Sequence, residues 1–222
     1  MRPSATRPAL YGYAPRLEAA LQGLGEDAGR LEILLVQFVT LIRDGKAVQM
    51  STRSGEFTTL REVLDEVGID AARFFYLLRS FHSHLDFDLT LAKTQSSENP
   101  VFYIQYVHAR ICSIFREAAD RGTAADGHPS LSVLTLPDEV GLMKKLARFP
   151  DVVFEAVRLR EPHRIPFYLL DLSREFHAFY HNHRFLGETP ERTQGRLALA
   201  RAVRNVVAVG LSLIGVSAPE RM

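Results

Sequence analysis

The chain has 222 residues, of which 46% are hydrophobic and 24% charged, a composition typical of a globular protein with one good core or two small ones. The single cysteine, Cys112, excludes an internal disulfide and a cysteine-rich zinc site, and it fits a reducing cytoplasm, where we expect the protein to be located. The formal net charge of +1 excludes polyanion binding through a bulk positive field. No segment is apolar enough to span a bilayer, so we expect no membrane partner.

The first half of the chain predicts short helices and a hairpin. Residues 1–16 are expected to form a largely disordered leader without a signal peptide, and residues 17–24 a short helix ended by glycines. Residues 31–49 indicate a β-hairpin around Asp44-Gly45, a residue pair that favours tight turns. Thr59 and Glu62 have the spacing of a capping box and predict a helix over residues 60–67.

A second helix is expected over residues 71–80, with Asp70 as its N-cap and Arg73 as the ion-pair partner of Asp70. Residues 81–89 are mixed and polar, and four of their side chains are expected to face solvent: His82, His84, Asp86 and Asp88. These few strands cannot complete a parallel sheet with crossover helices. Residues 17–98 are therefore expected to be the end of a larger domain.

From residue 99 the pattern is purely helical. Asn99 and Pro100 supply an N-cap and a first-turn proline. Apolar positions then recur at three- and four-residue steps on a face that we expect to be buried, with His108 as a hydrogen-bonded core histidine. That face comprises Val101, Ile104, His108, Ile111 and Phe115. A different face of the helix carries Tyr103, Tyr106 and Arg110.

Residues 120–134 predict a linker, and four helices follow it, over residues 137–148, 150–160, from about 166, and 193–214. The helix from about residue 166 is expected to bury Leu169, Leu172, Phe176 and Phe179, and to carry Ser173, His177, Tyr180 and Arg184 on its other face. The last helix is expected to bury Leu199, Val203, Val206 and Leu213. Five helices with short connections predict an antiparallel bundle over residues 99–222.

Two kinds of site follow from these residue types. The polar stretch 47–55 brings hydroxyls, a glycine and Arg53 together, which suits an anion such as phosphate, although an ordinary surface loop explains the same residues. The Tyr106 and Arg110 stripe, and the stripe of His177, Tyr180 and Arg184, suit stacking on bases and pairing with phosphates. We expect no metal site, because His181 and His183 have no carboxylate or cysteine at ligand spacing.

Several stretches in colinear order resemble arginyl-tRNA synthetase, a class I aminoacyl-tRNA synthetase. They are residues 12–16, 34–39, 50–60, 70–75, 85–88, 99–111 and 215–222. The resemblance runs from residue 12 to the last residue, with its main interruption at residues 120–134. The stretch 47–55, which contains Gln49-Met50-Ser51-Thr52-Arg53, is similar to the family's mobile Lys-Met-Ser-Lys-Ser loop, and Asp70-Ala71-Ala72-Arg73 to the Asp-Ala-Leu-Arg motif of its anticodon-binding domain.

The resemblance implies an arginine–tRNA ligase that uses ATP and Mg²⁺ to join arginine to tRNA(Arg). It implies a mainly α chain, with the end of a Rossmann-like catalytic domain over residues 17–98 and an anticodon-binding bundle over residues 99–222. It assigns ATP binding to Gln49, Met50, Ser51 and Arg53, and catalysis to Ser51, Thr52 and Arg53. It assigns tRNA binding to Tyr103, Tyr106, Arg110, His177, Tyr180, Arg184 and Met222.

Two departures from the family pattern change these expectations. The chain has no His-x-Gly-His segment, so we expect an N-terminal part of the same enzyme as a partner and no cofactor bound to this chain alone. Gln49 and Thr52 replace the two lysines of the consensus loop, and threonine cannot supply the lysine's charge to a transferring phosphate. The chain alone is therefore expected to bind tRNA without forming arginyl-adenylate. A stand-alone, non-catalytic RNA-binding module and a helical protein-interaction domain are the alternatives.

Overall fold

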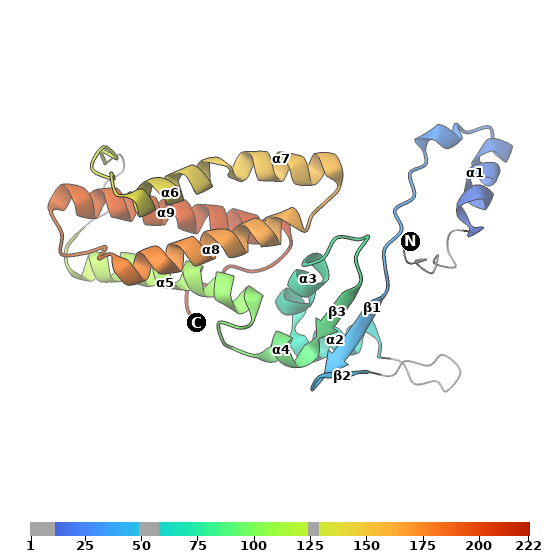
Figure 1. Ribbon diagram of the computed structural model, residues 1–222, viewed down its shortest axis with the longest axis horizontal. Coiled ribbons are helices and arrows are strands. Elements are labelled where there is room, and N and C mark those ends of the chain that lie inside the picture. Colours follow the sequence, from blue (N-terminus) through green and yellow to red (C-terminus); the bar gives the residue numbers. More distant parts are fainter. Residues whose placement is uncertain (1–11, 49–57, 124–128) are drawn as a thin grey trace, which may run out of the picture.

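The computed structural model describes residues 12–48, 58–123 and 129–222. A small α/β unit lies beside an elongated helical bundle (Figure 1). The first unit contains α1 (Ala14–Gly23), η2 (Ala28–Arg30), β1 (Val39–Arg43), β2 (Lys46–Ala47), α2 (Leu60–Val67), α3 (Ile69–Leu77), β3 (Leu85–Asp88) and α4 (Leu89–Lys93). The bundle contains α5 (Pro100–Asp120), α6 (Pro137–Ala147), α7 (Phe149–Leu159), α8 (Arg164–Asn182) and α9 (Pro190–Leu213). The expected fold, a mainly helical chain with a C-terminal bundle and a small α/β portion, is confirmed.

The N-terminal helix stands apart from the core. Helix α1 begins at Ala14, inside the segment predicted as a disordered leader and three residues before the predicted helix start. None of its residues is buried, and Figure 1 shows it away from the bundle and the sheet. An extended segment, residues 31–38, connects it to β1. Three large apolar side chains of this segment, Leu34, Val36 and Phe38, are exposed.

The predicted hairpin is present but shorter than expected. Strands β1 and β2 pair antiparallel around Asp44 and Gly45, which both have positive φ (52° and 75°). A third strand, β3, pairs with β1 in parallel, which gives the order β2-β1-β3. The sequence analysis missed this strand, although buried Leu85 and Phe87 alternate with more exposed aspartates at the strand period.

Helix capping was predicted correctly in two of three cases. The side chain of Asn99 accepts from the amide of Val101 over 3.2 Å at the start of α5, as expected. The Thr59 hydroxyl accepts from the amide of Glu62 over 3.2 Å, and the Glu62 carboxylate accepts from the amide of Thr59 over 2.7 Å, so the capping box is confirmed. The predicted N-cap role of Asp70 is wrong, because α3 begins one residue before it and Gly68 occupies the cap. The expected pair with Arg73 is wrong too: within the described residues, the Asp70 carboxylate bonds Gln105 and Ser217.

The bundle core follows the predicted helical faces closely. Eight of the predicted core residues are at most 4% exposed: Ile104, Ile111, Leu169, Leu172, Phe176, Phe179, Leu199 and Val203. Phe115 and Val206 are half-buried and pack against this core. Two assignments are wrong: Leu213 is 52% exposed at the end of α9, and Ser173 is buried although it was placed on the open face of α8. Figure 1 shows α8 running back along α7 and α9 returning along α8.

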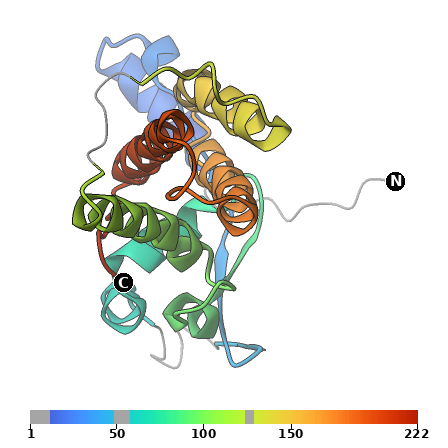
Figure 2. The same ribbon diagram turned by 90° about the vertical axis from the view of Figure 1, so that its left-hand side faces the viewer.

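The chain continues past the bundle as a short C-terminal segment, residues 215–222. Gly215 ends α9 with a φ of 69°. The segment then runs beside α5, where Nδ1 of His108 lies 2.9 Å from the carbonyl oxygen of Pro219 (Figures 1 and 2). The expected hydrogen-bonded core position of His108 is therefore confirmed. Nη1 of Arg116 donates to the carbonyl of Glu220 over 3.4 Å, further along the same helix.

Candidate nucleic-acid interface

An arginine between two tyrosines forms the centre of the candidate site. Helices α5 and α8 lie side by side, so that their two polar stripes meet. The Arg110 guanidinium carbon lies 4.6 Å from the ring centroid of Tyr106 on its own helix, and also 4.6 Å from that of Tyr180 on α8. Both distances are those of cation–π contacts, which hold the guanidinium in place while its N–H donors stay available to a ligand.

A row of rings extends from Arg110 toward the start of α5. His177 of α8 lies 4.5 Å from the Tyr103 ring and 5.9 Å from the Tyr106 ring, measured between centroids. Phe102 stacks on Tyr106 at 6.3 Å with an interplanar angle of 9°. Flat side chains in such a row offer stacking surfaces to several successive bases.

Two cavities border this row of rings. One, of about 480 Å³, is lined by residues that include Tyr106, Arg110, Arg116, Tyr180, Arg221 and Met222. The other, of about 360 Å³, is lined by Phe102, Tyr103, Tyr106, His177 and the turn of residues 95–97. Tyr106 lines both cavities, so one ring separates an arginine-rich space from an aromatic one. A base in the second cavity and a phosphate in the first would match these linings.

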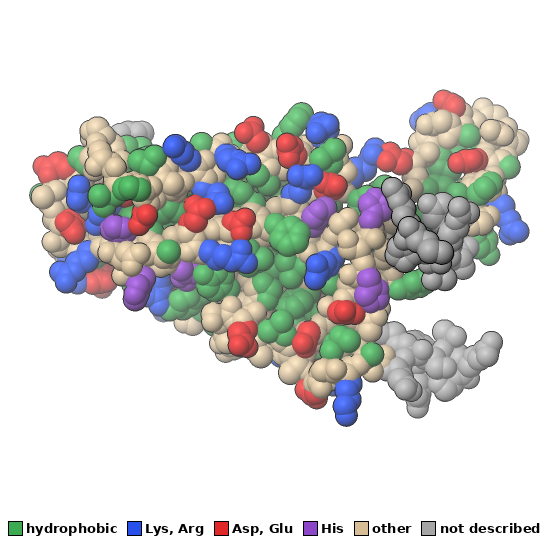
Figure 3. Space-filling model, viewed as in Figure 1, with side chains coloured by type: hydrophobic (Ala, Val, Ile, Leu, Met, Phe, Trp, Pro, Cys, Tyr) green, Lys and Arg blue, Asp and Glu red, His purple; other side chains and the backbone are tan. Residues whose placement is uncertain are grey.

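The surrounding charge is local rather than global. Arg110, Arg116 and Arg221 line the first cavity together with the single acid Glu117. On the face of the bundle shown in Figure 3, by contrast, basic and acidic side chains are interspersed. This distribution agrees with the net charge of +1 and makes the first cavity a local site that suits an anion.

His177 is expected to make stability depend on pH. Burial lowers its pKa below the ordinary value of 6.5, a backbone hydrogen bond with Tyr103 opposes this shift, and the charge of Arg110 adds to it. The unfolded chain therefore binds the proton more readily, and the stability due to neutral His177 is lost as pH falls from 6.5 through the folded-state pKa.

We expect the free energy of unfolding of His177→Gln to fall less than that of the wild type between about pH 7.5 and pH 5, as measured by urea denaturation. The matched control is His82→Gln, because His82 is exposed, and it should keep the wild-type pH dependence. An unchanged slope in His177→Gln would contradict the expectation.

The structure brings together six of the seven residues predicted for tRNA binding. They are Tyr103, Tyr106, Arg110, His177, Tyr180 and Met222. Arg184 lies elsewhere: α8 ends at Asn182, so Arg184 leaves the stripe and its side chain is exposed. The predicted ATP-loop residues, Gln49 to Arg53, lie outside the described residues. Sequence reasoning missed Phe102 and Arg221, although Phe102 is four residues before Tyr106 and so shares its helix face.

The remaining candidates of the sequence analysis are structural. Nε2 of His183 lies 3.0 Å from Asp138, so the expected solvated imidazole is wrong there, while His181 is exposed. Asp88 caps α4 by accepting from the amide of Leu91 over 2.9 Å, and Asp86 lies 3.1 Å from His84 on the surface. Over the described residues, no cluster of three or more potential ligands can hold a metal ion.

Comparison with known families identifies the bundle. The model of the DALR anticodon binding domain matches residues 104–222. The chain belongs to the DALR anticodon-binding domain family. The matched residues contain α6 to α9, the C-terminal segment and most of α5, and with them Tyr106, Arg110, His177 and Tyr180 of the candidate site.

This DALR-family chain is similar to parts of larger proteins. It is 54% identical over 215 residues to an arginine–tRNA ligase of Thioalkalivibrio sulfidiphilus, covering 96% of this chain and 37% of that protein. A solved structure of a putative arginyl-tRNA synthetase from Campylobacter jejuni superimposes with a TM-score of 0.83 at 35% identity, covering 97% of this chain and 46% of that one. The arginyl-tRNA synthetase of Thermus thermophilus superimposes with a TM-score of 0.70 at 28% identity, covering 94% of this chain and 39% of that one. The chain thus spans just over a third of the length of the curated relative it matches. Among the described helices, none has the length and apolar character needed to cross a bilayer.

Proposed function

We propose that the row of rings and the cavities beside it bind unpaired anticodon bases of tRNA(Arg). The observation that carries the proposal is the Arg110 guanidinium held 4.6 Å from the rings of both Tyr106 and Tyr180, with Met222 lining the same cavity. Single-stranded RNA is recognised by stacking on aromatic and guanidinium planes and by hydrogen bonds to base edges. The arrangement provides both, at a place where arginines outnumber acids. The family match and the similarity to arginine–tRNA ligases support tRNA as the RNA concerned.

We also propose that the chain acts as one part of a whole arginine–tRNA ligase. That enzyme would take arginine, ATP and Mg²⁺ as well as tRNA(Arg), in the cytoplasm, and residues 17–98 would complete its catalytic domain. The similarity of 96% of this chain to 37% of an arginine–tRNA ligase supports this assignment. Gln49, Met50, Ser51 and Arg53 remain the proposed contacts of ATP, and Ser51, Thr52 and Arg53 remain the proposed catalytic residues of the whole enzyme. We assign no catalytic step to the described residues.

The RNA site is tested by measuring the affinity of the chain for an anticodon stem-loop of a tRNA(Arg) at two or more salt concentrations. We expect Tyr106→Ala to weaken binding by about 1–3 kcal/mol, the typical contribution of one base stacked on an aromatic ring. Arg110→Ala should weaken binding and also reduce the dependence of log K on log salt concentration by about one unit, since one phosphate contact is lost.

The control is Arg79→Ala, because Arg79 is exposed and follows α3, away from the rings. It should leave affinity and salt dependence close to those of the wild type. Equal losses in Arg79→Ala and Arg110→Ala would contradict the proposed site. Binding of a protein partner that is insensitive to both salt and nuclease would instead favour a protein-interaction domain.

A further inference from the structure

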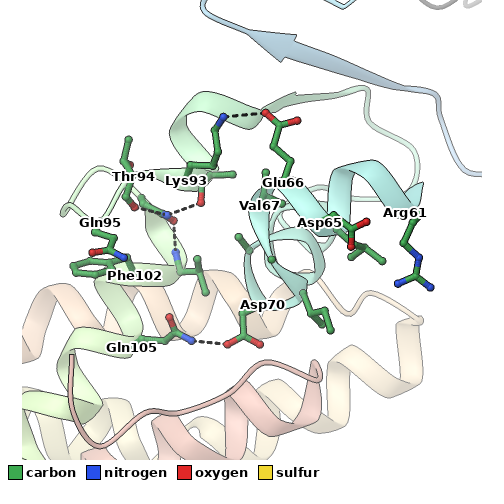
Figure 4. A pocket seen from close by; sticks show the side chains of 17 residues that line it. Arg61, Asp65, Glu66, Val67, Asp70, Lys93, Thr94, Gln95, Phe102 and Gln105 are labelled. Atoms are coloured by element: carbon green, nitrogen blue, oxygen red, sulfur yellow. Dashed lines mark hydrogen bonds and ion pairs between the residues drawn. The ribbon is translucent and has the colours of Figure 1, made fainter. Parts of the chain in front are cut away.

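Asp70, the first residue of the Asp-Ala-Ala-Arg stretch on α3, is bonded to a part of the chain 147 residues away. One carboxylate oxygen accepts from the amide of Ser217 over 3.1 Å. The other accepts from Nε2 of Gln105 over 2.8 Å and from the Ser217 hydroxyl. Figure 4 shows Asp70 and Gln105 pointing toward one another beside the C-terminal segment. A carboxylate with three donors on it makes charge-assisted hydrogen bonds, which are stronger than neutral ones.

Arg73, the last residue of the Asp-Ala-Ala-Arg stretch, also contacts the C-terminal segment. The guanidinium of Arg73 lies against Gly215, where a side chain would meet it. Gly215 also has a φ of 69°, which glycine adopts without strain. The two charged residues of α3 therefore hold two neighbouring points of the C-terminal segment, directly after α9 ends.

Beyond these two points, successive residues of the segment contact successive positions along α5. Gln105 donates to the carbonyl of Ser217 over 3.0 Å, His108 lies 2.9 Å from the carbonyl of Pro219, and Arg116 donates to that of Glu220 over 3.4 Å. The segment ends with Arg221 and Met222 in the wall of the cavity that contains Arg110. Since the segment belongs to neither helix nor strand, side-chain contacts set its register.

We propose that Asp70 is a positioning residue for the RNA site: it fixes the register of residues 215–222 and so places Met222 in the cavity. This inference rests on the proposed function of that cavity. It also links the α/β unit to the RNA site, because Asp70 lies on α3 whereas Arg110 and Met222 lie in the bundle and its extension. RNA in the cavity would then stabilise the contacts of Asp70, and these contacts would raise RNA affinity by the same factor.

The test combines RNA affinity with hydrogen–deuterium exchange of residues 215–222. Asp70→Asn keeps the size of the side chain but replaces one acceptor by a donor that faces other donors. We expect it to weaken binding of the anticodon stem-loop about tenfold and to speed exchange in the segment. Ser217→Ala, which removes only a hydroxyl, should act in the same direction with a smaller effect. Asp65→Asn, on exposed Asp65 of α2, is the matched control and should change neither readout.

A double-mutant cycle separates positioning from general destabilisation. In a Met222→Ala background, Asp70→Asn should weaken RNA binding much less than it does in the wild type, because the residue that it positions is gone. Full additivity of the two substitutions, or wild-type affinity in Asp70→Asn despite a freely exchanging segment, would overturn the inference. If the wild type does not bind the RNA at all, the proposed function fails. In that case, unchanged exchange of residues 215–222 in Asp70→Asn would overturn the positioning role as well. Faster exchange of these residues would support the role of Asp70 in fixing the C-terminal segment.

Discussion

Replacing Arg196 with alanine is expected to lower the free energy of unfolding by about 3–5 kcal/mol, one of the two largest effects that we expect from a single substitution. Nε of Arg196, on α9, donates to a carboxylate oxygen of Glu139, on α6, over 2.9 Å, and the two side chains are only 3% and 0% exposed. Arg196 also donates to the carbonyl of Arg184 over 2.6 Å. The substitution would leave a carboxylate and a carbonyl in the core without this partner, and burying such groups is costly.

The measurement is urea denaturation followed by circular dichroism, with two comparisons. Arg174→Ala removes an exposed ion pair with Asp171, whose atoms are 2.6 Å apart, and should cost no more than about 1 kcal/mol. The double variant Arg196→Met, Glu139→Leu removes both charges and should be clearly more stable than Arg196→Ala. A loss in Arg196→Ala no larger than that in Arg174→Ala would show that the buried pair has no special role.

The same ion pair shows where sequence reasoning on the bundle stops. Helical periodicity identified the buried faces of α5, α8 and α9, because apolar residues at three- and four-residue steps face the core whatever their partners are. Arg196 lies one turn before Leu199 on such a face, but nothing local indicates that a charged side chain is buried there. Its burial depends on Glu139, which lies 57 residues earlier on another helix.

Long-range partners also explain the errors in the α/β unit. Asp70 has the local pattern of an N-cap, but its partners are on α5 and in the C-terminal segment. Strand β3 is only four residues long and carries two aspartates, so its pattern is weak until β1 is known to lie beside it. The prediction for Leu213 was wrong for a different reason. Its neighbours Leu211 and Ile214 are 0% and 5% exposed, so the end of α9 is covered, but Leu213 lies outside the buried face of the helix.

The candidate site was predicted as two separate stripes and is one place in the structure. Each stripe follows from spacing along its own helix. Their meeting depends on α5 and α8 packing in the same direction, so that Tyr103 meets His177 while Arg110 meets Tyr180. Spacing cannot predict this packing. It also cannot predict that α8 ends at Asn182, which removes Arg184 from the stripe.

Phe87→Ala is expected to lower the free energy of unfolding of the α/β unit by about 3–5 kcal/mol, the usual cost of emptying a buried phenylalanine site. Phe87 is the central buried side chain of β3 and is 0% exposed. Its ring stacks on Phe75 at 5.2 Å and meets Tyr76 edge-on at 5.1 Å, and both belong to α3. The substitution therefore removes two ring contacts between the sheet and the helix that carries Asp70. Phe38→Ala is the control, because Phe38 directly precedes β1 but is 74% exposed, and it should change stability by no more than about 0.5 kcal/mol.

Exchange measurements on Phe87→Ala also test how the two units depend on one another. Local opening of the α/β unit should speed amide exchange in β1, β3 and α3, while the amides of α5 and α9 stay protected by the bundle core. Exchange should also become faster in residues 215–222, since α3 supplies Asp70 and Arg73 to them. Uniformly faster exchange in all helices would mean instead that the chain unfolds as one cooperative unit. Faster exchange confined to the sheet would mean that α3 keeps its hold on the C-terminal segment without β3.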